Sequence, residues 1–276
     1  MLKSMKVALW QIKSWKGSLR VLIVMLLAVM FTIYKSSSYI DYLKSVDGIV
    51  NIFETYVIVS SNGWHHALMF MLALVLFADA PFMDNNSLYV VCRIGRYKWC
   101  LGKILYIIMA SIIFNAVIML TTIAVSVAYS YGGNIWSESF LRVLDGEVTG
   151  SGYDVFFSNY EIAYELPPMQ TAFVAAGLGI LLNSMMGSML FVLNSVNGKV
   201  LGFSVTGIMY FAGFAISGMD IAKFLPLQHS ILGQHKGTSD LKMAVIYLGG
   251  ITLLMIIASF LCIRKVDYKI TTGDRV

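Results

Sequence analysis

The chain has 276 residues, of which 58% are hydrophobic and 13% are charged, and its formal net charge is +5. Soluble globular domains carry about 25% charged residues, so this composition, with a mean hydropathy of +0.75, excludes an ordinary soluble domain. The sequence instead predicts an all-α polytopic membrane protein, folded as a single transmembrane domain over residues 1–276.

Residues 1–20 have the pattern of a basic amphipathic helix. At 100° per residue, one arc holds the apolar side chains Met5, Ala8, Ile12, Trp15 and Leu19. The opposite side holds the cations Lys3, Lys6, Lys13, Lys16 and Arg20, and Trp10 fits neither face cleanly. Such a helix suits the headgroup plane of a bilayer, so we expect Lys3, Lys6, Trp10, Lys13 and Trp15 at the membrane interface. A merely basic tail is the alternative.

Six apolar runs predict six transmembrane helices. They cover residues 19–34, 64–80, 104–129, 169–193, 200–217 and 243–263. A bilayer core needs about 20 residues, so the first run is short and is expected to borrow residues from the preceding helix or from 36–40. Residues 218–242 include an apolar stretch broken by Lys223 and Pro226. A re-entrant segment and a surface helix are equal alternatives for that stretch.

The charges are unevenly distributed between the two sets of connections. Segments 1–20, 79–103, 194–199 and 264–276 hold 14 of the 20 Lys and Arg residues, whereas the other connections hold 11 of the 15 acids. Short cytoplasmic loops keep their Lys and Arg residues. We therefore expect a multi-pass protein of the cytoplasmic membrane with both termini in the cytoplasm. Cys92, Cys100 and Cys262 all fall on that side, where thiols stay reduced.

The basic connection 84–103 has the pattern of a small structure of its own. Its start, Asp84-Asn85-Asn86-Ser87, offers helix N-cap side chains, and residues 88–93 can form two turns. Gly95 can end those turns in a left-handed conformation. The cations Arg93, Arg96, Lys98 and Lys103, together with Tyr97 and Trp99, favour a docking surface. A loop that only sets the topology is the alternative.

The largest connection, residues 130–168, is acidic and aromatic. Its acids are Glu138, Asp145, Glu147, Asp154, Glu161 and Glu165, against the single cation Arg142. The many aromatic residues argue against plain disorder and indicate a folded cap or a membrane-lying segment on the outer face. Acids interleaved with aromatic rings suit a cationic amphipathic peptide, so these six acids are candidate substrate-facing residues.

The predicted spans contain no ionisable residue near their middle. Intramembrane charges usually mark proton relays and ion sites, so their absence argues against an ion-driven transporter and against a voltage sensor. Milder polar residues are present, among them Asn115, Asn183, Ser184 and Ser188. Helix packing and the lining of a substrate path are the two interpretations of these residues.

Catalytic motifs are missing from the sequence. There is no H-E-x-x-H, no G-x-S-x-G and no phosphate loop of the form G-x-x-x-x-G-K-[ST]. His65, His66, His229 and His235 lack carboxylates at metal-ligand spacing, so we interpret them as interface or loop residues. We expect a non-catalytic subunit with no metal, no cofactor of its own and no nucleic-acid partner.

Residues 90–103 carry an Arg-x-Gly followed by basic residues, an aromatic residue and Gly-Lys, at the start of the third apolar run. This segment resembles the signature of the ABC-2 type permeases, the membrane subunits of one class of ABC transporters. The six runs, the basic N-terminal helix and Leu225-Pro226-Leu227 before the last run resemble the same family. The long acidic connection departs from the lipid- and polysaccharide-exporting members. In size and loop pattern the chain is similar to small Gram-positive permeases for antimicrobial peptides.

The resemblance implies an elbow helix over residues 1–20, a cytoplasmic coupling helix within 84–103 and a re-entrant segment before the last span. The residues that would dock on the ATPase are Arg93, Gly95, Arg96, Lys98 and Trp99. Two copies of a separate ATPase would bind ATP and Mg²⁺, and a second permease subunit would complete the transporter. The implied function is movement of a hydrophobic or peptide substrate by alternating access. A non-transporting scaffold or sensor, and a channel without ATP, are the alternatives.

Overall fold

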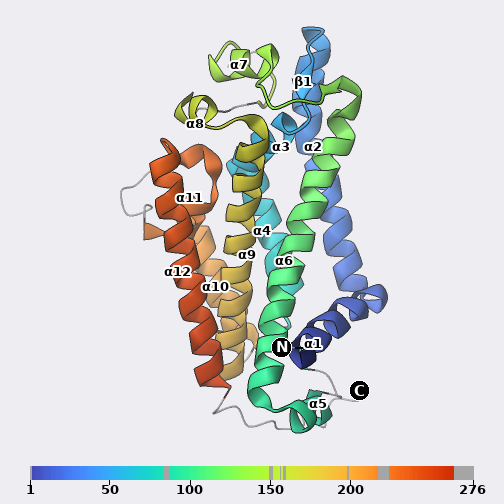
Figure 1. The fold of residues 1–276 in the computed structure, drawn as a ribbon, viewed down its shortest axis with the longest axis vertical. Coiled ribbons are helices and arrows are strands. Elements are labelled where there is room, and N and C mark those ends of the chain that lie inside the picture. Colours follow the sequence, from blue (N-terminus) through green and yellow to red (C-terminus); the bar gives the residue numbers. More distant parts are fainter. Residues whose placement is uncertain are drawn as a thin grey trace.

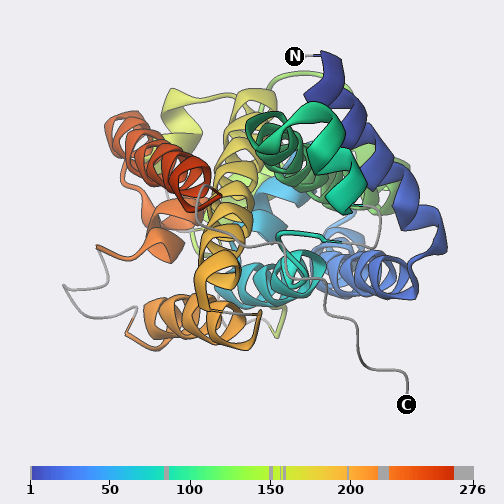
Figure 2. The ribbon, with the colours of Figure 1, turned by 90° about the horizontal axis from the view of Figure 1, so that it is seen from below.

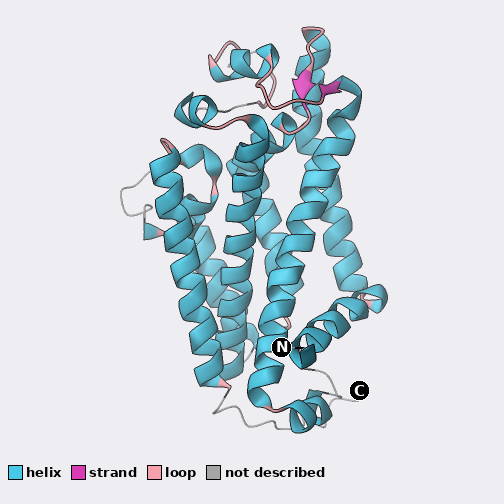
Figure 3. Cartoon of the chain, in the orientation of Figure 1, coloured by secondary structure: helices cyan, strands magenta, loops and turns pink. Residues whose placement is uncertain are grey.

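The computed structural model describes residues 2–83, 87–148, 152–155, 157, 160–197, 199–216 and 224–263. They form an elongated bundle whose long helices run side by side along one axis (Figure 1). Helix accounts for nearly all regular structure in these ranges (Figure 3), and one short parallel pair joins β1, Val50–Asn51, to β2, Ser130–Tyr131. The all-α prediction is confirmed. The predicted tail, 264–276, and residues 217–223 lie outside the described ranges.

Four described helices are long and apolar enough to cross a membrane. They are α2 (Leu19–Ser45), α6 (Arg96–Ser126, continued by the 3-10 turn η2, Val127–Tyr129), α9 (Pro168–Asn197) and α12 (Thr238–Cys262). A fifth span arises only if α3 (Glu54–Ser61) and α4 (Gly63–Phe77) count as one, and these meet at 81°. Helix α10, Lys199–Ala215, is apolar but shorter. The prediction of six spans is therefore not confirmed, although the composition of these helices is that of a membrane protein.

Two predicted spans have different limits in the structure. Helix α2 continues to Ser45 because Thr32, Ser36, Tyr39 and Leu43 extend one buried face beyond the apolar run. The predicted outer connection therefore begins only after Ser45. Helix α4 begins after Asn62, whose side chain accepts a hydrogen bond from the His65 amide at 3.0 Å and caps the new helix.

Helix α9 lies at the centre of the bundle. It packs against α6, α10 and α12, and the view along the bundle shows these helices around it (Figure 2). Large side chains from neighbouring helices fill the interior, among them Phe77 of α4, Phe114 of α6 and Phe191 of α9. The bundle is thus held by interdigitated apolar side chains that also position both of its ends.

One end of the bundle, which we call the basic end, carries α1 (Leu2–Lys13) and α5 (Ser87–Ile94). The predicted helix over residues 1–20 is interrupted: α1 stops at Lys13, and a 3-10 turn, η1 (Ser14–Gly17), leads into α2. The break is explained by Ser18, whose hydroxyl accepts from the Val21 amide at 3.4 Å and caps α2. Helix α1 therefore lies across the bundle instead of continuing α2 (Figure 1).

The opposite end, which we call the capped end, carries the β1–β2 pair and two short helices, α7 (Glu138–Leu144) and α8 (Tyr160–Glu165). The described part of residues 130–168, which we call the cap, thus contains regular structure, and its position on the outer face stays a prediction. Helix α11 (Pro226–Ser230) and the 3-10 turn η4 (Leu232–Gln234) precede α12 and pack against α3, α9 and α10.

Candidate docking surface at the basic end

Helix α5 ends abruptly at Gly95, as predicted. Gly95 has φ +87° and ψ 151°, and its amide donates to the Val91 carbonyl at 2.8 Å. A side chain is disfavoured at this positive φ, so glycine is needed where the chain turns from α5 into α6. The ψ value departs from the left-handed helical conformation that we expected. Asp84, Asn85 and Asn86, the predicted capping residues, lie outside the described ranges.

The segment after Gly95 is helix and not loop, which corrects the predicted limits of the 84–103 connection. Helix α6 begins at Arg96, so the helical period sorts the basic and aromatic side chains onto two faces. Arg96, Tyr97 and Lys98 are exposed, and with Arg93 on α5 they form the accessible basic surface. Trp99 and Lys103 face the interior.

Trp99 is only 1% exposed, so the expectation that it would touch a partner is corrected. Its ring lies 6.2 Å from the ring of Phe191, and the Lys103 ammonium lies 5.4 Å from the Trp99 ring centroid. A tryptophan in this position attaches the start of α6 to α9. Trp99 therefore supports the docking surface from beneath.

Lys103 is fully buried and joins three segments. Its Nζ donates to Gln11 Oε1 of α1 at 2.6 Å and to the Phe82 carbonyl, after α4, at 2.8 Å. A buried ammonium requires such partners, because its desolvation is costly. Nothing in the sequence distinguishes this lysine from the exposed Lys98.

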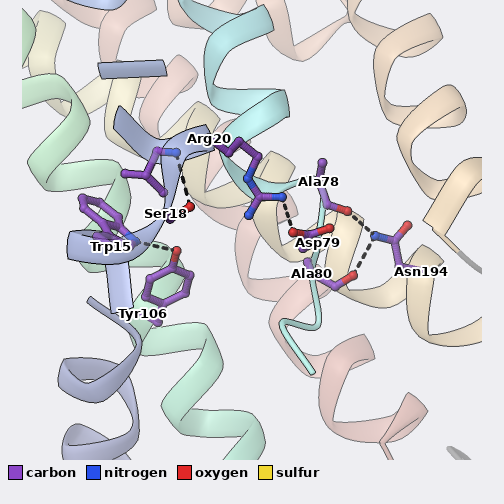
Figure 4. A network of polar contacts seen from close by, with 9 residues as sticks. Trp15, Ser18, Arg20, Ala78, Asp79, Ala80, Tyr106 and Asn194 are labelled. Carbon is purple, nitrogen blue, oxygen red and sulfur yellow. Dashed lines mark hydrogen bonds and ion pairs between the residues drawn. The ribbon is translucent and has the colours of Figure 1, made fainter. Parts of the chain in front are cut away.

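Helix α1 lies directly on α6 at Gly102. A Cβ atom at Gly102 would lie 2.7 Å from Val7 Cβ and 2.9 Å from the Ser4 carbonyl oxygen, so only glycine permits this approach. The indole of Trp15 donates to the Tyr106 hydroxyl at 3.0 Å and fixes the far end of the same crossing (Figure 4). Of the predicted interface residues, Lys3, Lys6, Trp10 and Lys13 are exposed and Trp15 is half-buried.

A polar network beside this crossing joins the ends of α2, α4 and α9 (Figure 4). Arg20, at the start of α2, forms an ion pair with Asp79, just after α4. The Asn194 amide of α9 donates to the carbonyls of Ala78 at 3.2 Å and Ala80 at 2.7 Å. These contacts satisfy backbone groups where α4 ends, so α2, α4 and α9 are connected at the basic end.

The predicted intramembrane polar residues divide into two groups. Asn115 and Asn183 line an interior cavity of about 40 Å³, which they share with His65, His66 and Ser230. Ser184 and Ser188 are buried outside it. The structure therefore brings the two asparagines to one cavity and leaves the two serines in helix packing.

His65 and His66 are not interface or loop residues, which corrects our interpretation of this pair. A hydrogen bond of 3.2 Å joins His65 Nε2 to Thr32 Oγ1 of α2, and one of 2.8 Å joins His66 Nε2 to Ser230 Oγ of α11. The sharp bend before α4 places both rings inside the bundle. No group of three or more His, Cys, Asp or Glu side chains within the described residues could hold a metal ion.

Three of the six predicted outer acids make contacts within the chain. Glu138 pairs with Arg142, Asp154 pairs with Lys35, and Glu165 accepts from the Thr238 amide at 2.8 Å, where α12 begins. The remaining three, Asp145, Glu147 and Glu161, are exposed. The cap thus uses part of its acidic set to attach itself to the bundle and presents the rest to its surroundings.

Glu54 is a buried acid of the cap whose importance the sequence did not indicate. Its Oε1 accepts from the Ser137 amide at 2.6 Å, and its Oε2 accepts from the Ser137 hydroxyl at 2.6 Å and from the Asn51 amide at 3.0 Å. Glu54 joins β1 and the start of α3 to the start of α7.

Comparisons of the chain with family models, with curated proteins and with solved structures found no match in any of the three. The features that bear on function are therefore the residues of the basic end and of the cap.

Proposed function

We propose that this chain is the membrane subunit of an ABC-2 type transporter, and that α5 with the first turn of α6 forms its contact with an ATPase. The observation that carries the proposal is the arrangement of α5. This short helix protrudes at the basic end and stops before Gly95. It presents Tyr89 and Arg93 on its accessible side, and the first turn of α6 adds Arg96 and Lys98. Arginine and tyrosine are favoured in interface hot spots.

The support beneath α5 suits the transmission of movement. Trp99 and Lys103 connect the start of α6 to α9 and α1 through buried contacts. Helix α6 is continuous from Arg96 to Ser126 and extends from the basic end toward the capped end. A displacement applied at α5 would therefore move a rigid helix that extends along the bundle.

In this proposal the basic end faces the cytoplasm and the cap faces outward, because short cytoplasmic connections keep Lys and Arg residues. The bent pair α3–α4 would serve as one broken span and α10 as another, which would complete six spans with the four long helices. ATP and Mg²⁺ would bind to two copies of the separate ATPase, and a second permease subunit would complete the complex in the cytoplasmic membrane.

The cap supports a hydrophobic or cationic peptide as the substrate class. Asp145, Glu147 and Glu161 are exposed on it. A groove of about 330 Å³ at the capped end is lined by Asp47, Trp136, Glu138 and Arg142, among other residues. Carboxylates beside an aromatic ring attract cationic amphipathic chains.

The proposal is tested by co-purification with the Walker-motif ATPase that we expect in a neighbouring reading frame. Arg96→Glu with Lys98→Glu should yield a folded, inserted protein that no longer co-purifies with this ATPase or stimulates it. Lys13→Glu with Lys16→Glu makes the same change of charge on exposed positions of α1 and η1 and should preserve the complex. Full coupled transport by the first variant would contradict the proposal. Retention of a different cytoplasmic partner, without ATP-dependent transport, would favour a scaffold or sensor.

A further inference from the structure

A groove of about 490 Å³ lies between α1 and α5 at the basic end. Its lining combines an apolar floor with a basic rim. The floor is formed by Val7 and Trp10 of α1 and by Val90 and Ile94 of α5, and the rim is formed by Lys3, Lys6 and Arg93. Both helices pack on α6, which holds the two walls of the groove in place (Figure 2).

The three rim cations have no acidic partner among the residues that the structure describes. Lys3, Lys6 and Arg93 are all exposed, and no ion pair within those residues includes any of them. Neither α1 nor α5 contains an acidic residue. The groove therefore presents three positive charges above an apolar surface and favours a ligand that is anionic at one end and apolar at the other.

The level of the groove relative to a bilayer follows from α1. Leu2, Met5, Leu9 and Trp10 are 77%, 46%, 44% and 41% exposed, on the same helix as the exposed lysines. A helix with apolar and basic side chains both exposed, crossing the end of a bundle of membrane-length helices, lies at the boundary between headgroups and acyl chains. The groove therefore opens where phospholipids are available.

We propose that this groove binds an anionic phospholipid. The phosphate lies between the two lysines of α1 and Arg93 of α5, since a guanidinium binds phosphate oxygens in a bidentate manner. An acyl chain covers Val7, Trp10, Val90 and Ile94 and removes their apolar surface from water. The lipid contacts both α1 and α5 and so holds α5 in place. That this would help α5 to contact an ATPase rests on the proposed function. The binding itself requires no ATPase.

Trp10 provides the measurement, because it belongs to the groove. The full-length protein in neutral detergent micelles is titrated with phosphatidylglycerol that carries brominated acyl chains, which quench tryptophan fluorescence on contact. The contribution of Trp10 is the difference between the native protein and Trp10→Phe. We expect half-maximal quenching at an about tenfold lower lipid fraction than with brominated phosphatidylcholine of the same chains.

Matched variants distinguish specific binding in the groove from general electrostatic attraction to anionic micelles. Lys3→Gln with Lys6→Gln should abolish the preference for phosphatidylglycerol, whereas Lys13→Gln with Lys16→Gln removes the same charge outside the groove and should retain it. Arg93→Gln should weaken the preference from the opposite wall, and Arg96→Gln should not. Should the Lys3/Lys6 variant fail to fold, the two arginine variants still decide the matter.

Three results would overturn the proposal. The first is an equal loss of preference in both lysine pairs, which would show diffuse electrostatic attraction only. The second is equal quenching by the two lipids. The third is displacement of the lipid by millimolar glycerol phosphate, which would assign the rim to a soluble phosphate ligand. These titrations contain no ATPase and measure lipid binding alone, so failure here is distinguishable from failure of the proposed function.

Discussion

Lys103 of α6 donates a hydrogen bond to Gln11 of α1, with 2.6 Å between Nζ and Oε1. Because the ammonium is fully buried, this contact makes α1 part of the folded bundle. A helix that only rested on a membrane surface would need no such contact. The buried charge of Lys103 thus helps to hold α1 against the bundle, in addition to any attraction between surface charges and the membrane.

The first prediction concerns this contact. Lys103→Met should leave Gln11 and the Phe82 carbonyl without their donor, and one unsatisfied buried polar group costs about 1–3 kcal/mol. The purified protein should melt at a lower temperature, and protease should release α1 more readily. Lys98→Met, at an exposed position five residues earlier in the same helix, is the control and should match the native protein. Equal melting of the two variants would show that the buried contacts contribute nothing.

The second prediction concerns the approach of α1 to α6. In Gly102→Ala the new methyl group would meet Val7 Cβ and the Ser4 carbonyl, so α1 must shift. We expect faster proteolysis of residues 2–13 and a loss of the Trp15–Tyr106 hydrogen bond, visible as a change in tryptophan emission. Gly250→Ala in α12 is the matched control, because nothing lies within 4 Å of its new Cβ. Unchanged proteolysis in Gly102→Ala would contradict this account of the packing.

The third prediction concerns the orientation in the membrane. Cys92 is exposed on α5 and Cys100 is buried in α6. An impermeant maleimide should therefore label Cys92 in inverted vesicles and not in intact cells, while Cys100 should react only after unfolding. A cysteine introduced at Asp145, exposed on the cap, should show the reverse accessibility. Labelling of Cys92 in intact cells would invert the proposed topology.

The fourth prediction concerns the cap. Glu54→Ala should leave the Ser137 amide, the Ser137 hydroxyl and the Asn51 amide without their acceptor. One unsatisfied buried polar group costs about 1–3 kcal/mol. Amide protection factors within Glu138–Leu144, normalised for intrinsic exchange, should therefore be lower in the variant than in the native protein.

Glu147→Ala, at an exposed position of the cap, is the matched control and should protect Glu138–Leu144 as the native protein does. Equal protection in the two variants would show that Glu54 does not hold the cap.

The sequence was sufficient to predict the long helices and the two chemically different ends. Apolar runs reveal helices because burial in lipid or protein requires continuous apolar residues, and Gly95 marked a break correctly. The sequence was not sufficient to predict that Lys98 is exposed and Lys103 buried, because both are lysines in one basic run. Their separation needs the start of α6, since the helical period from Arg96 turns Lys103 inward with Trp99.

The buried polar residues show the same dependence on tertiary contacts. His65 and His66 follow a bend of 81° after α3, and no local signal gives that angle. Glu54 has the surroundings of a surface acid in sequence, yet Ser137, 83 residues away, supplies two of its hydrogen bonds. Such residues could be recognised only after the segments that surround them were placed.

The shortness of two neighbouring helices has a consequence for the surrounding lipid. At 1.5 Å per residue, α4 with 15 residues and α10 with 17 measure about 22 and 25 Å, against a hydrocarbon core of about 30 Å. They lie side by side, with Phe70 and Tyr210 stacked at 3.4 Å. In the proposed six-span arrangement, lipids adjoining this pair would compress or tilt to match it. Lipids with shorter acyl chains should therefore gather beside α4 and α10.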